Sequence, residues 1–457
     1  MALHKIRAGL DIPIAGDPVQ RVDVAVAPTR VALLGADYPG LMPTMLVAPG
    51  DQVRRGEALF RDKAFPEVQF TAPASGRIAA IHRGPKRALV SVVIDLSDAE
   101  RAGDSSRARA LDSYTGARPE ALAPEAVRRL LVESGMWTAL RTRPFSRVPD
   151  PASSPRALFV TAMDTHPLAP AVEVALAGRE VDFAAGVTAL AKLTVGPTYV
   201  CVGVGSPLAT PSGATVRREE FSGPHPAGTA GVHINVLDPV IRGKTVWHIG
   251  YQDVAAVGHL VLTGQLDTRR VVSLAGPGVL RPRLLATRVG TATDELVAGE
   301  LAPGAQRVVS GSVLGGRTAH GDAEGYLGRF HNQVTALPEG SQREFLGWLL
   351  PGLGKFSITN AFASSLGRVR KYAFTTNTNG SPRALVPIGT YEAVMPMDIE
   401  PTFLIRALVT GDAEEAESLG CLELDEEDLA LSTFVCSAKN EYGPMLREIL
   451  ERIAREY

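Results

Sequence analysis

The chain has 457 residues, of which 45% are hydrophobic and 21% charged, and its formal net charge is -2. This composition is ordinary for a globular protein with room for three or four domains, and it offers no basic field for nucleic acid. Three cysteines without a C-x-x-C pair argue against a disulfide framework and a zinc site, and no apolar run reaches the roughly 18 residues of a membrane span. The same cysteine usage favours a reducing compartment. The N-terminus "MALHKIRAGLDIP" lacks the apolar core of a secretory signal, so we do not expect it to be one.

Short strands separated by glycine and proline turns are predicted between residues 46 and 94, for example in "APGDQVRRGEALF". The pattern is typical of the barrel-sandwich hybrid found in biotinyl and lipoyl carriers. The triplet "DKA" places Lys63 where a lipoyl group could be attached. The hairpin apex, however, is expected near Phe65 and Pro66, and an ordinary surface lysine in a carrier-like fold is the favoured interpretation.

The middle of the chain alternates helix and strand signals. After a polar linker at 95–123, "PEAVRRLLVESGMW" predicts a helix that begins at Pro124 and buries Val127, Leu130 and Leu131. Apolar strands are expected at 157–162 and 198–205, with a helix at 183–193 between them. This alternation predicts a parallel, doubly wound sheet. Residues 271–314 then read as a small mixed domain with three strands and one helix at "ATDELVAGE".

The last third of the chain carries helix signals. Capping residues are expected at Ser341 with Glu344, at Asp412 with Glu415, and at Asp425 before an acidic first turn. The final helix is predicted to place Met445, Ile449 and Ile453 on one stripe. The segment "FLGWLLPGLGKF", residues 345–356, is apolar on most faces and is either a buried helix or a docking patch against another subunit.

Phosphate-binding and metal-binding signals are weak. "VGVGSPLAT" has Leu208 at the third glycine position of a dinucleotide loop, and "GLGKFS" lacks the Ser or Thr of a Walker loop. The nine histidines form no i, i+4 pair and no H-E-x-x-H motif, so no metal site is predicted.

One stretch, "GMWTALRTRPFSRVP" at 135–149, combines flat aromatic rings with permanently charged donors. Trp137 and Phe145 could stack on a planar ligand with carbonyl acceptors, such as a quinone, while Arg141, Arg143 and Arg147 donate to it. The alternative is that both rings pack a loop and the arginines stay in solvent.

The segment "GCLELDEEDLALSTFVCSAKNEYG", residues 420–443, resembles the end of a bacterial ferredoxin motif. Counting back from Cys436, the C-x2-C-x2-C-x3-C-P spacing requires cysteines at 432, 429 and 426 and a proline at 437. The chain has Ser432, Leu429, Glu426 and Ser437 there. A ferredoxin scaffold that has lost its cluster is therefore predicted.

The whole chain resembles the family of A subunits of the sodium-translocating NADH:quinone oxidoreductase. More distantly, it is similar to the C subunit of the Rnf complex and to the NADH-binding flavoprotein subunit of complex I. The resemblance covers nearly all residues and rests on several uninterrupted stretches: "GLDIPIAGDP" (9–18), "VALLGADYPGLMPTMLV" (31–47), "GMWTALRTRPFS" (135–146), "FVTAMDTHPLAP" (159–170), "FSGPHPAG" (221–228), "VPIGTYEAVMPMDIEPT" (386–402) and "CLELDEEDLALSTFVC" (421–436).

The resemblance implies a multidomain α/β plus β fold with four parts. These are a barrel-sandwich hybrid at 1–115, a Rossmann-like α/β domain at 116–255, a small ubiquitin-like mixed domain at 256–325, and a helical, ferredoxin-like bundle without clusters at 326–457.

The resemblance also implies a peripheral subunit on the cytoplasmic side of the bacterial inner membrane, without a flavin or iron–sulfur centre of its own. Partner subunits would supply NADH oxidation, flavins, the iron–sulfur centre and sodium transport. Quinone contact is implied at Trp137, Arg141, Arg143 and Phe145, together with Tyr38 and Met42 of the matching N-terminal stretch. A free-standing flavin or iron–sulfur NADH dehydrogenase is the alternative, and the missing cysteines and the missing glycine-rich loop count against it.

Overall fold

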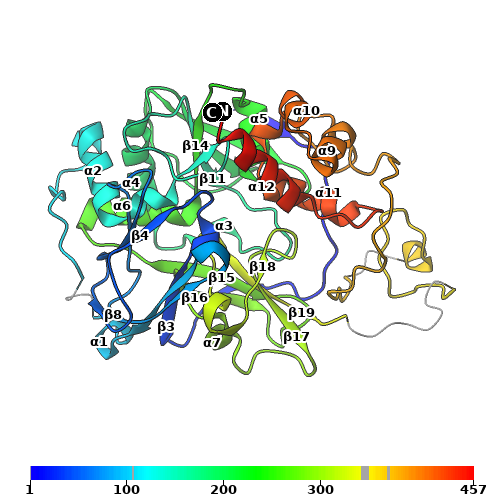
Figure 1. The fold of residues 1–457 in the computed structure, drawn as a ribbon, viewed down its shortest axis with the longest axis horizontal. Helices are drawn as coiled ribbons and strands as arrows, with labels where there is room; N and C mark the ends of the chain where they lie inside the picture. The colour runs from blue at the N-terminus through cyan, green and yellow to red at the C-terminus, as the bar shows by residue number, and fades with distance from the viewer. Residues whose placement is uncertain (1, 105–107, 341–348, 368–370, 457) are drawn as a thin grey trace.

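The structure is a computed structural model that describes residues 2–104, 108–340, 349–367 and 371–456. Within these ranges the strands form two six-stranded sheets, one four-stranded sheet and one three-stranded sheet. Figure 1 shows the C-terminal helices lying beside one six-stranded sheet, and the N-terminal strands lying near the other. The predicted multidomain α/β plus β architecture is confirmed.

The central sheet is parallel except at one edge, where β10 runs antiparallel to β14. Alternate residues of its middle strand face different helices. Leu158 and Val160 share a core with α4 (Glu180–Leu190) and α6 (Tyr251–Thr263), whereas Phe159 packs with α5 (Ala230–Leu237). The sheet is therefore covered on both faces, as the doubly wound prediction requires. The strands in spatial order are β1 (Leu3–Lys5), β13 (Val216–Ser222), β12 (Thr198–Gly203), β11 (Leu158–Ala162), β14 (Val246–Gly250) and β10 (Arg141–Arg143).

The helices of this part agree with the sequence pattern. The helix α2 (Pro124–Ser134) begins with its proline in the first turn, and it buries Val127, Leu130 and Leu131 as predicted. The predicted helix at 183–193 is confirmed, although it begins three residues earlier. The remaining helices are α3 (Val172–Ala175), α4 (Glu180–Leu190), α5 (Ala230–Leu237) and α6 (Tyr251–Thr263).

The barrel-like part is built from short antiparallel strands around stacked Phe60 and Phe70, whose ring centroids are 4.6 Å apart. Lys63 is exposed and follows β6 directly, whereas Phe65 and Pro66 lie at the middle of the hairpin loop. The strands are β3 (Arg30–Leu34), β4 (Pro43–Met45), β5 (Gln52–Val53), β6 (Ala58–Asp62), β7 (Gln69–Thr71), β8 (Gly76–Arg83) and β9 (Leu89–Leu96).

The second six-stranded sheet is mixed, and it confirms the strands and the helix predicted for residues 271–314. Its order is β18 (Arg317–Thr318), β17 (Gln306–Ser310), β19 (Gln333–Pro338), β15 (Arg269–Ala275), β16 (Arg283–Arg288) and β2 (Val19–Val24), with the short helices α7 (Thr293–Val297) and α8 (Gly321–Glu324).

Long-range pairings connect the predicted parts more closely than the sequence pattern indicates. The N-terminal strands β1 and β2 leave the barrel and pair with β13 and β16. The boundary expected after residue 255 falls inside α6, and the boundary expected after 325 would remove β19 from its sheet. Because a hydrogen-bonded helix or sheet cannot be divided without losing those bonds, the structure favours boundaries near residues 264 and 338.

The predicted linker at 95–123 also has a structural role. It begins with the end of β9 and with α1 (Asp98–Arg101), and Glu100 on α1 is only 1% exposed. Arg55 of the barrel part donates to the Glu100 carboxylate, as does Arg288 of β16 at 2.6 Å. Burial alone would raise the pKa of Glu100, but these two arginines hold it below its ordinary value. The segment therefore ties the barrel to the mixed sheet.

The C-terminal part is helical, as predicted. Asp412 accepts the backbone N–H of Glu415, and Asp425 forms a capping box with Asp428. The predicted capping box at Ser341 lies outside the described residues. The helices are α9 (Pro401–Thr410), α10 (Ala413–Ser418), α11 (Ala430–Val435) and α12 (Tyr442–Ile453), and the 3-10 turns are Ala363–Leu366, Cys421–Glu423 and Glu426–Leu429.

Ile449 and Ile453 of α12 are buried and Met445 is half-buried, which confirms the predicted stripe. No helix in the described ranges is both long enough and apolar enough to cross a membrane.

Candidate functional site

The candidate site lies at the point where the strand order of the central sheet reverses. From β11 the chain proceeds through β12 and β13 on one side and then returns to β14 on the other. Ligands of open α/β sheets bind outside the carboxyl ends of the strands at such a reversal. Here β14 ends at Gly250 and α6 begins at Tyr251, directly beside β10 and the loop that follows β18.

Among the residues predicted to contact a quinone, Arg141 is the one that offers a hydrogen-bond donor at the strand reversal. Its guanidinium carbon lies 4.4 Å from the centre of the Phe330 ring, a cation–π contact, and its Nη1 lies 3.7 Å from Asp425 Oδ2. Its side chain is 23% exposed, and it donates no side-chain hydrogen bond to any residue that the structure describes. The guanidinium of Arg141 can therefore donate to an added oxygen acceptor without losing a hydrogen bond.

Tyr38 reaches the same aromatic ring from the barrel part. Its ring packs edge-on against Phe70 at 4.8 Å and against Phe330 at 6.2 Å. Burial raises the pKa of Tyr38 to about 12, so its hydroxyl stays protonated and can donate a hydrogen bond. Tyr38 and Arg141, predicted from stretches about a hundred residues apart, thus both contact Phe330.

A buried carboxylate balances the neighbouring arginines. Asp253, in the first turn of α6, accepts from Arg270 and from Arg329, the latter at 2.6 Å. Burial would raise the pKa of Asp253, but the charges of Arg270 and Arg329 lower it below its ordinary value. The aspartate is therefore ionised, and it fixes both arginines beside Phe330.

Beside Asp253 lies a cavity of about 40 Å³, which Arg141, Gln252, Arg270, Phe330 and Asn332 help to line. The cavity has room for water or a small ion, but it is far smaller than the roughly 300 Å³ or more of a typical ligand pocket. A quinone ring enters only if the Phe330 ring or the Arg141 side chain moves.

Arg143 lies one layer deeper and is fully buried. Its guanidinium pairs with Asp425 Oδ2 at 3.1 Å and with Asp428 Oδ2 at 3.5 Å. Its Nη1 also lies 3.2 Å from His248 Nε2. Because arginine only donates, His248 Nε2 accepts and the imidazole is neutral. Burial and the charges of Arg141 and Arg143 hold the pKa of His248 well below its ordinary value, which is consistent with a neutral imidazole.

The two aspartates of the capping box differ in their titration. Burial favours the neutral form of both, but the charge of Arg143 holds the pKa of Asp425 well below its ordinary value. Burial raises the pKa of Asp428 to about 7: Arg143 opposes the rise, but the charges of Glu427 and Asp425 add to it. Nearby His166 is held protonated, with its pKa raised to about 9 by Asp164 despite burial.

Trp137, Phe145 and Met42 lie outside the cavity. Trp137 is fully buried: its indole N–H donates to the carbonyl of Pro149 at 2.8 Å and its ring meets Trp247 edge-on at 5.4 Å. Phe145 is half-buried, and its carbonyl accepts from Arg447 of α12 at 2.8 Å. Met42 is 53% exposed and belongs to the barrel surface. The alternative that the rings pack is met for Trp137, but Arg143 is buried and not in solvent, and the quinone alternative stays a prediction.

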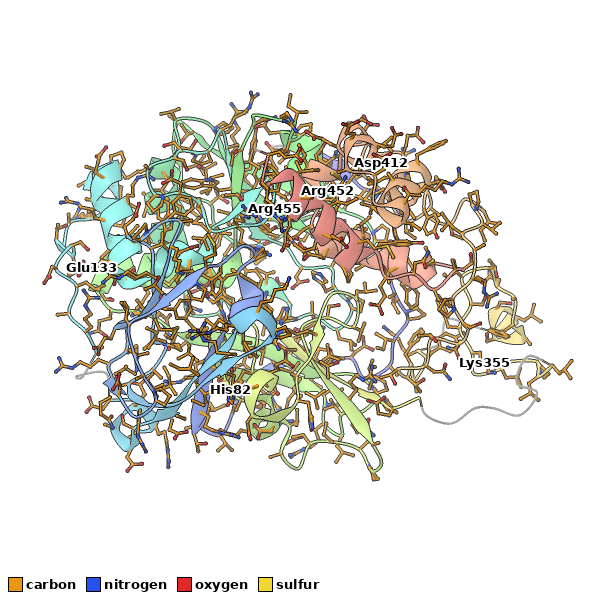
Figure 2. The ribbon with its side chains drawn as sticks, in the orientation of Figure 1. His82, Glu133, Lys355, Asp412, Arg452 and Arg455 are labelled. Carbon is orange, nitrogen blue, oxygen red and sulfur yellow. The ribbon has the colours of Figure 1, made fainter. Side chains whose placement is uncertain are left out.

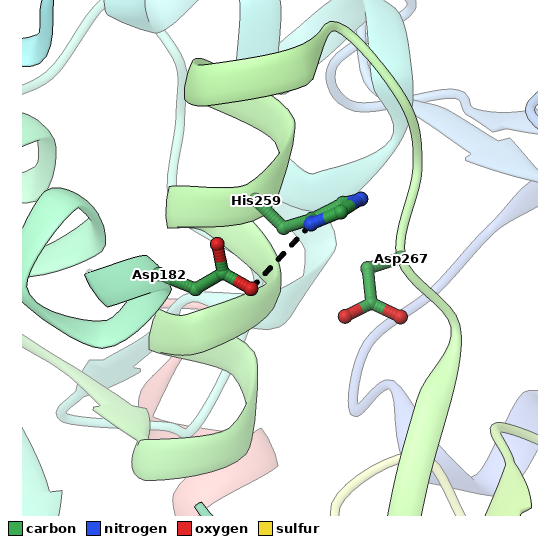
Figure 3. A group of neighbouring side chains, drawn as sticks. All are labelled: Asp182, His259 and Asp267. Atoms are coloured by element: carbon green, nitrogen blue, oxygen red, sulfur yellow. Dashed lines mark ion pairs between the residues drawn. The ribbon is translucent and has the colours of Figure 1, made fainter. Parts of the chain in front are cut away.

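Asp182, His259 and Asp267 form the one group in the described ranges whose side chains could hold a metal ion (Figure 3). His259 Nδ1 lies 3.4 Å from Asp182 Oδ2. Asp267, however, already accepts from Arg179 at 2.7 Å and from Arg269 through both of its oxygens. The group is explained as an ion-pair network joining α4, the end of α6 and β15, because two guanidinium groups occupy the oxygens a cation would need.

Several residues of the site carried no recognisable sequence signal. Phe330 lies in a turn within "GRFHN", outside any periodic run, and Asp253 is an ordinary acidic residue in a helix first turn. Asp425 was predicted as a helix cap but not as the partner of Arg143. A basic and an acidic residue 282 positions apart cannot be matched from one sequence.

Known protein families match the chain both in its separate domains and over its full length. Three domain families match: the NqrA N-terminal barrel-sandwich hybrid domain at residues 4–97, the NqrA second alpha/beta domain at 122–266 and the NQRA C-terminal domain at 271–321. The A subunit of the Na⁺-translocating NADH-quinone reductase of Pseudomonas aeruginosa (strain UCBPP-PA14) is 54% identical over 452 residues, which is 99% of both chains. The chain belongs to this A-subunit family.

Other members of the A-subunit family show the same full-length agreement. The proteins of that name from Serratia proteamaculans and Tolumonas auensis are 53% and 51% identical, each over 99% of both chains. Among solved structures, an NAD⁺-reducing NiFe hydrogenase in the air-oxidised state is 16% identical over 48% of each chain, with a TM-score of 0.34.

The Asp428→Asn variant tests the buried carboxyl pair. An aspartate in the unfolded chain has a pKa of about 3.9. Between that pH and about pH 7, Asp428 is therefore protonated in the folded state but ionised in the unfolded state. The stability that Asp428 contributes is therefore present at acid pH and lost as the pH rises through about 7. Between about pH 5 and pH 8, we expect the unfolding free energy of the native chain to fall by about 1–3 kcal/mol relative to the variant.

Urea unfolding across this pH interval measures the difference. Asp98→Asn serves as the control, because the side chain of Asp98 is 98% exposed, and its pH profile should parallel that of the native chain. Parallel profiles for Asp428→Asn as well would contradict the titration assigned to Asp428.

Proposed function

We propose that the chain is the peripheral A subunit of a membrane Na⁺-translocating NADH:ubiquinone reductase, on the cytoplasmic side of the bacterial inner membrane. The observation that carries this proposal is the identity of 54% over 99% of the chain with a protein of that name. Its partners are the membrane and flavin subunits of the same complex. In this role the chain serves a respiratory, ion-transporting translocase, while the isolated chain is not itself catalytic.

The redox groups of the complex belong to partner subunits in this proposal. At the ferredoxin-like positions, Glu426 pairs with Arg447 at 2.5 Å, Leu429 is fully buried in the core, and Ser432 is also buried. Cys436 contacts the hydroxyls of Tyr391 and Tyr442. A four-iron cluster needs four thiolates at such spacing, and packed side chains that are not thiolates fill three of these positions. NADH, flavins and the iron–sulfur centre are accordingly assigned to other chains.

The four parts predicted from the sequence belong to the same proposal. The α/β part is Rossmann-like in its strand reversal, the mixed part is ubiquitin-like, and the C-terminal helices represent a ferredoxin-like bundle that lost its clusters. We set the boundaries of the second and third parts near residues 264 and 338, where α6 and β19 end.

Quinone contact is proposed at the cavity beside Phe330. Tyr38 supplies an aromatic ring and Arg141 a guanidinium that donates no side-chain hydrogen bond to the described residues, while Met42 and Phe145 are proposed as more distant contacts on the barrel and on the loop after β10. Trp137 and Arg143 have no exposed surface, so they hold the 135–149 stretch in place instead of contacting the ring. The quinone head group would displace the Phe330 ring and accept from Arg141.

Affinity purification tests the assembly. Tagged chain is solubilised from its native membranes in mild detergent, and mass spectrometry identifies the proteins that accompany it. We expect flavin-bearing membrane subunits and sodium-stimulated NADH:quinone reductase activity. A colourless chain recovered alone under conditions that preserve the activity elsewhere would overturn the proposal. A purified chain that carries its own flavin would favour the free-standing dehydrogenase.

Arg141→Met and Phe330→Leu variants test the quinone contact within the assembled complex. Arg141→Met removes the donor, and we expect it to weaken binding of a quinone analogue by about tenfold. Phe330→Leu removes the ring that the quinone must displace, and we expect it to strengthen that binding. Arg217→Met is the matched control, because exposed Arg217 lies 5.9 Å from the Tyr199 ring, at the far side of the sheet. Unchanged affinity in both site variants would contradict quinone binding at this cavity and would indicate a site on a partner subunit.

A further inference from the structure

One end of the molecule exposes many large apolar side chains. Residues 349–367 and 371–391 have little regular structure, and Figure 1 shows them as gold and orange loops beyond the sheets and the C-terminal helices. Leu353 is 66% exposed and Leu366 91% exposed. Other exposed apolar side chains on this segment are Leu349, Leu350, Ile358, Val386 and Ile388. Such a concentration marks a surface that contacts an apolar partner.

The charge of the segment is one-sided. The chain has 49 acidic residues among 457, yet the sequence from residue 345 to 391 contains none. At the average frequency a stretch of this length would hold several. The basic residues of the described part are Lys355, Lys371 and Arg383, of which Lys371 pairs with Asp17 at 3.1 Å. The segment is therefore apolar and positive, although the chain as a whole is slightly negative.

An aromatic cluster fixes this segment on the C-terminal helices. The ring of Phe356 lies 5.8 Å from Tyr372, 5.7 Å from Phe374 and 6.3 Å from Phe434 of α11. Lys355 lies against the Phe362 ring at 5.9 Å, and Figure 2 shows it at the outer end of the molecule. The aromatic rings are thus used for internal packing, while the leucines on either side of them face outward.

We propose that residues 349–367 and 371–391 form a bilayer-contact segment, whose exposed leucines enter the headgroup region of a membrane carrying anionic lipid. Surfaces that bind lipid combine apolar side chains with lysine and arginine and lack acidic groups, because anionic headgroups attract the one and repel the other. A protein partner would not require the complete absence of carboxylates. The proposal rests on the proposed function, since a membrane complex brings this chain to a bilayer surface.

Co-sedimentation of the purified full chain with vesicles tests the segment. We expect binding to phosphatidylcholine vesicles that contain phosphatidylglycerol, little binding to pure phosphatidylcholine vesicles, and weaker binding as salt increases. Leu353→Asp and Leu366→Asp should each weaken binding by about tenfold, because each replaces an inserting side chain by a charge that the headgroups repel. At low salt, Lys355→Glu should weaken vesicle binding more than either leucine substitution does.

Matched controls lie elsewhere on the surface. Val195→Asp changes a 98% exposed apolar residue of the α/β part, and Lys63→Glu reverses an exposed charge on the barrel; both should bind vesicles as the native chain does. The proposal of a bilayer-contact segment is overturned if the native chain does not bind the vesicles, or if the segment variants bind them as well as the native chain does.

Purification of the same variants from membranes separates this inference from the proposed function. One outcome is that the native chain does not bind vesicles, while Leu353→Asp and Leu366→Asp no longer co-purify with the partner subunits. In that case the segment contacts a protein, and only the lipid proposal fails. Vesicle binding by a chain that brings no partner subunits would sustain the segment and overturn the proposed function.

Discussion

The buried pairing of Arg143 with Asp425 and Asp428 is the interaction on which the arrangement of the molecule depends. A fully buried guanidinium is tolerated only where carboxylates and hydrogen bonds compensate it. Here the compensation comes from the capping box that begins the Glu426–Leu429 turn, so the same two carboxylates start a helix and bind the edge strand β10. Arg447 of α12 extends the network by donating to Asp425 at 2.7 Å. The C-terminal helices are thereby held on the central sheet.

This pairing also determines what the candidate site can do. Arg141 and Arg143 are two residues apart on β10, so their side chains leave the strand on the same face. Both lie near Asp425 Oδ2, and Arg141 also packs against Phe330. Asp253 fixes Arg270 and Arg329 on the other side of the cavity. Positive charge is thus concentrated at the strand reversal, and Arg141 keeps the donors that a carbonyl ligand would use.

Local patterns in the sequence predicted most of the elements, because strand and helix periodicity and capping act over a few residues. The alternating β11 to α6 segment, the stripe of α12 and the caps at Asp412 and Asp425 are of this kind. Contacts across the fold were not accessible in this way. The departure of β1 and β2 from the barrel, the burial of Glu100 in a polar linker and the meeting of Tyr38 with Arg141 at Phe330 each depend on residues far apart in the chain. Trp137 and Arg143 had suitable chemistry for a ligand, but only packing shows that neither reaches a surface.

Hydrogen exchange in the Arg143→Met variant measures the central interaction most directly. Removing one partner of a buried pair costs about 3–5 kcal/mol, so the amides of α12 should exchange at least about tenfold faster, while those of the central strand β12 stay protected. Arg242→Ala is the control, because the exposed pair of Arg242 with Glu417, at 2.6 Å, also joins the α/β part to the C-terminal helices and should contribute little. Unchanged exchange in α12, or an equal effect from Arg242→Ala, would contradict the role assigned to Arg143.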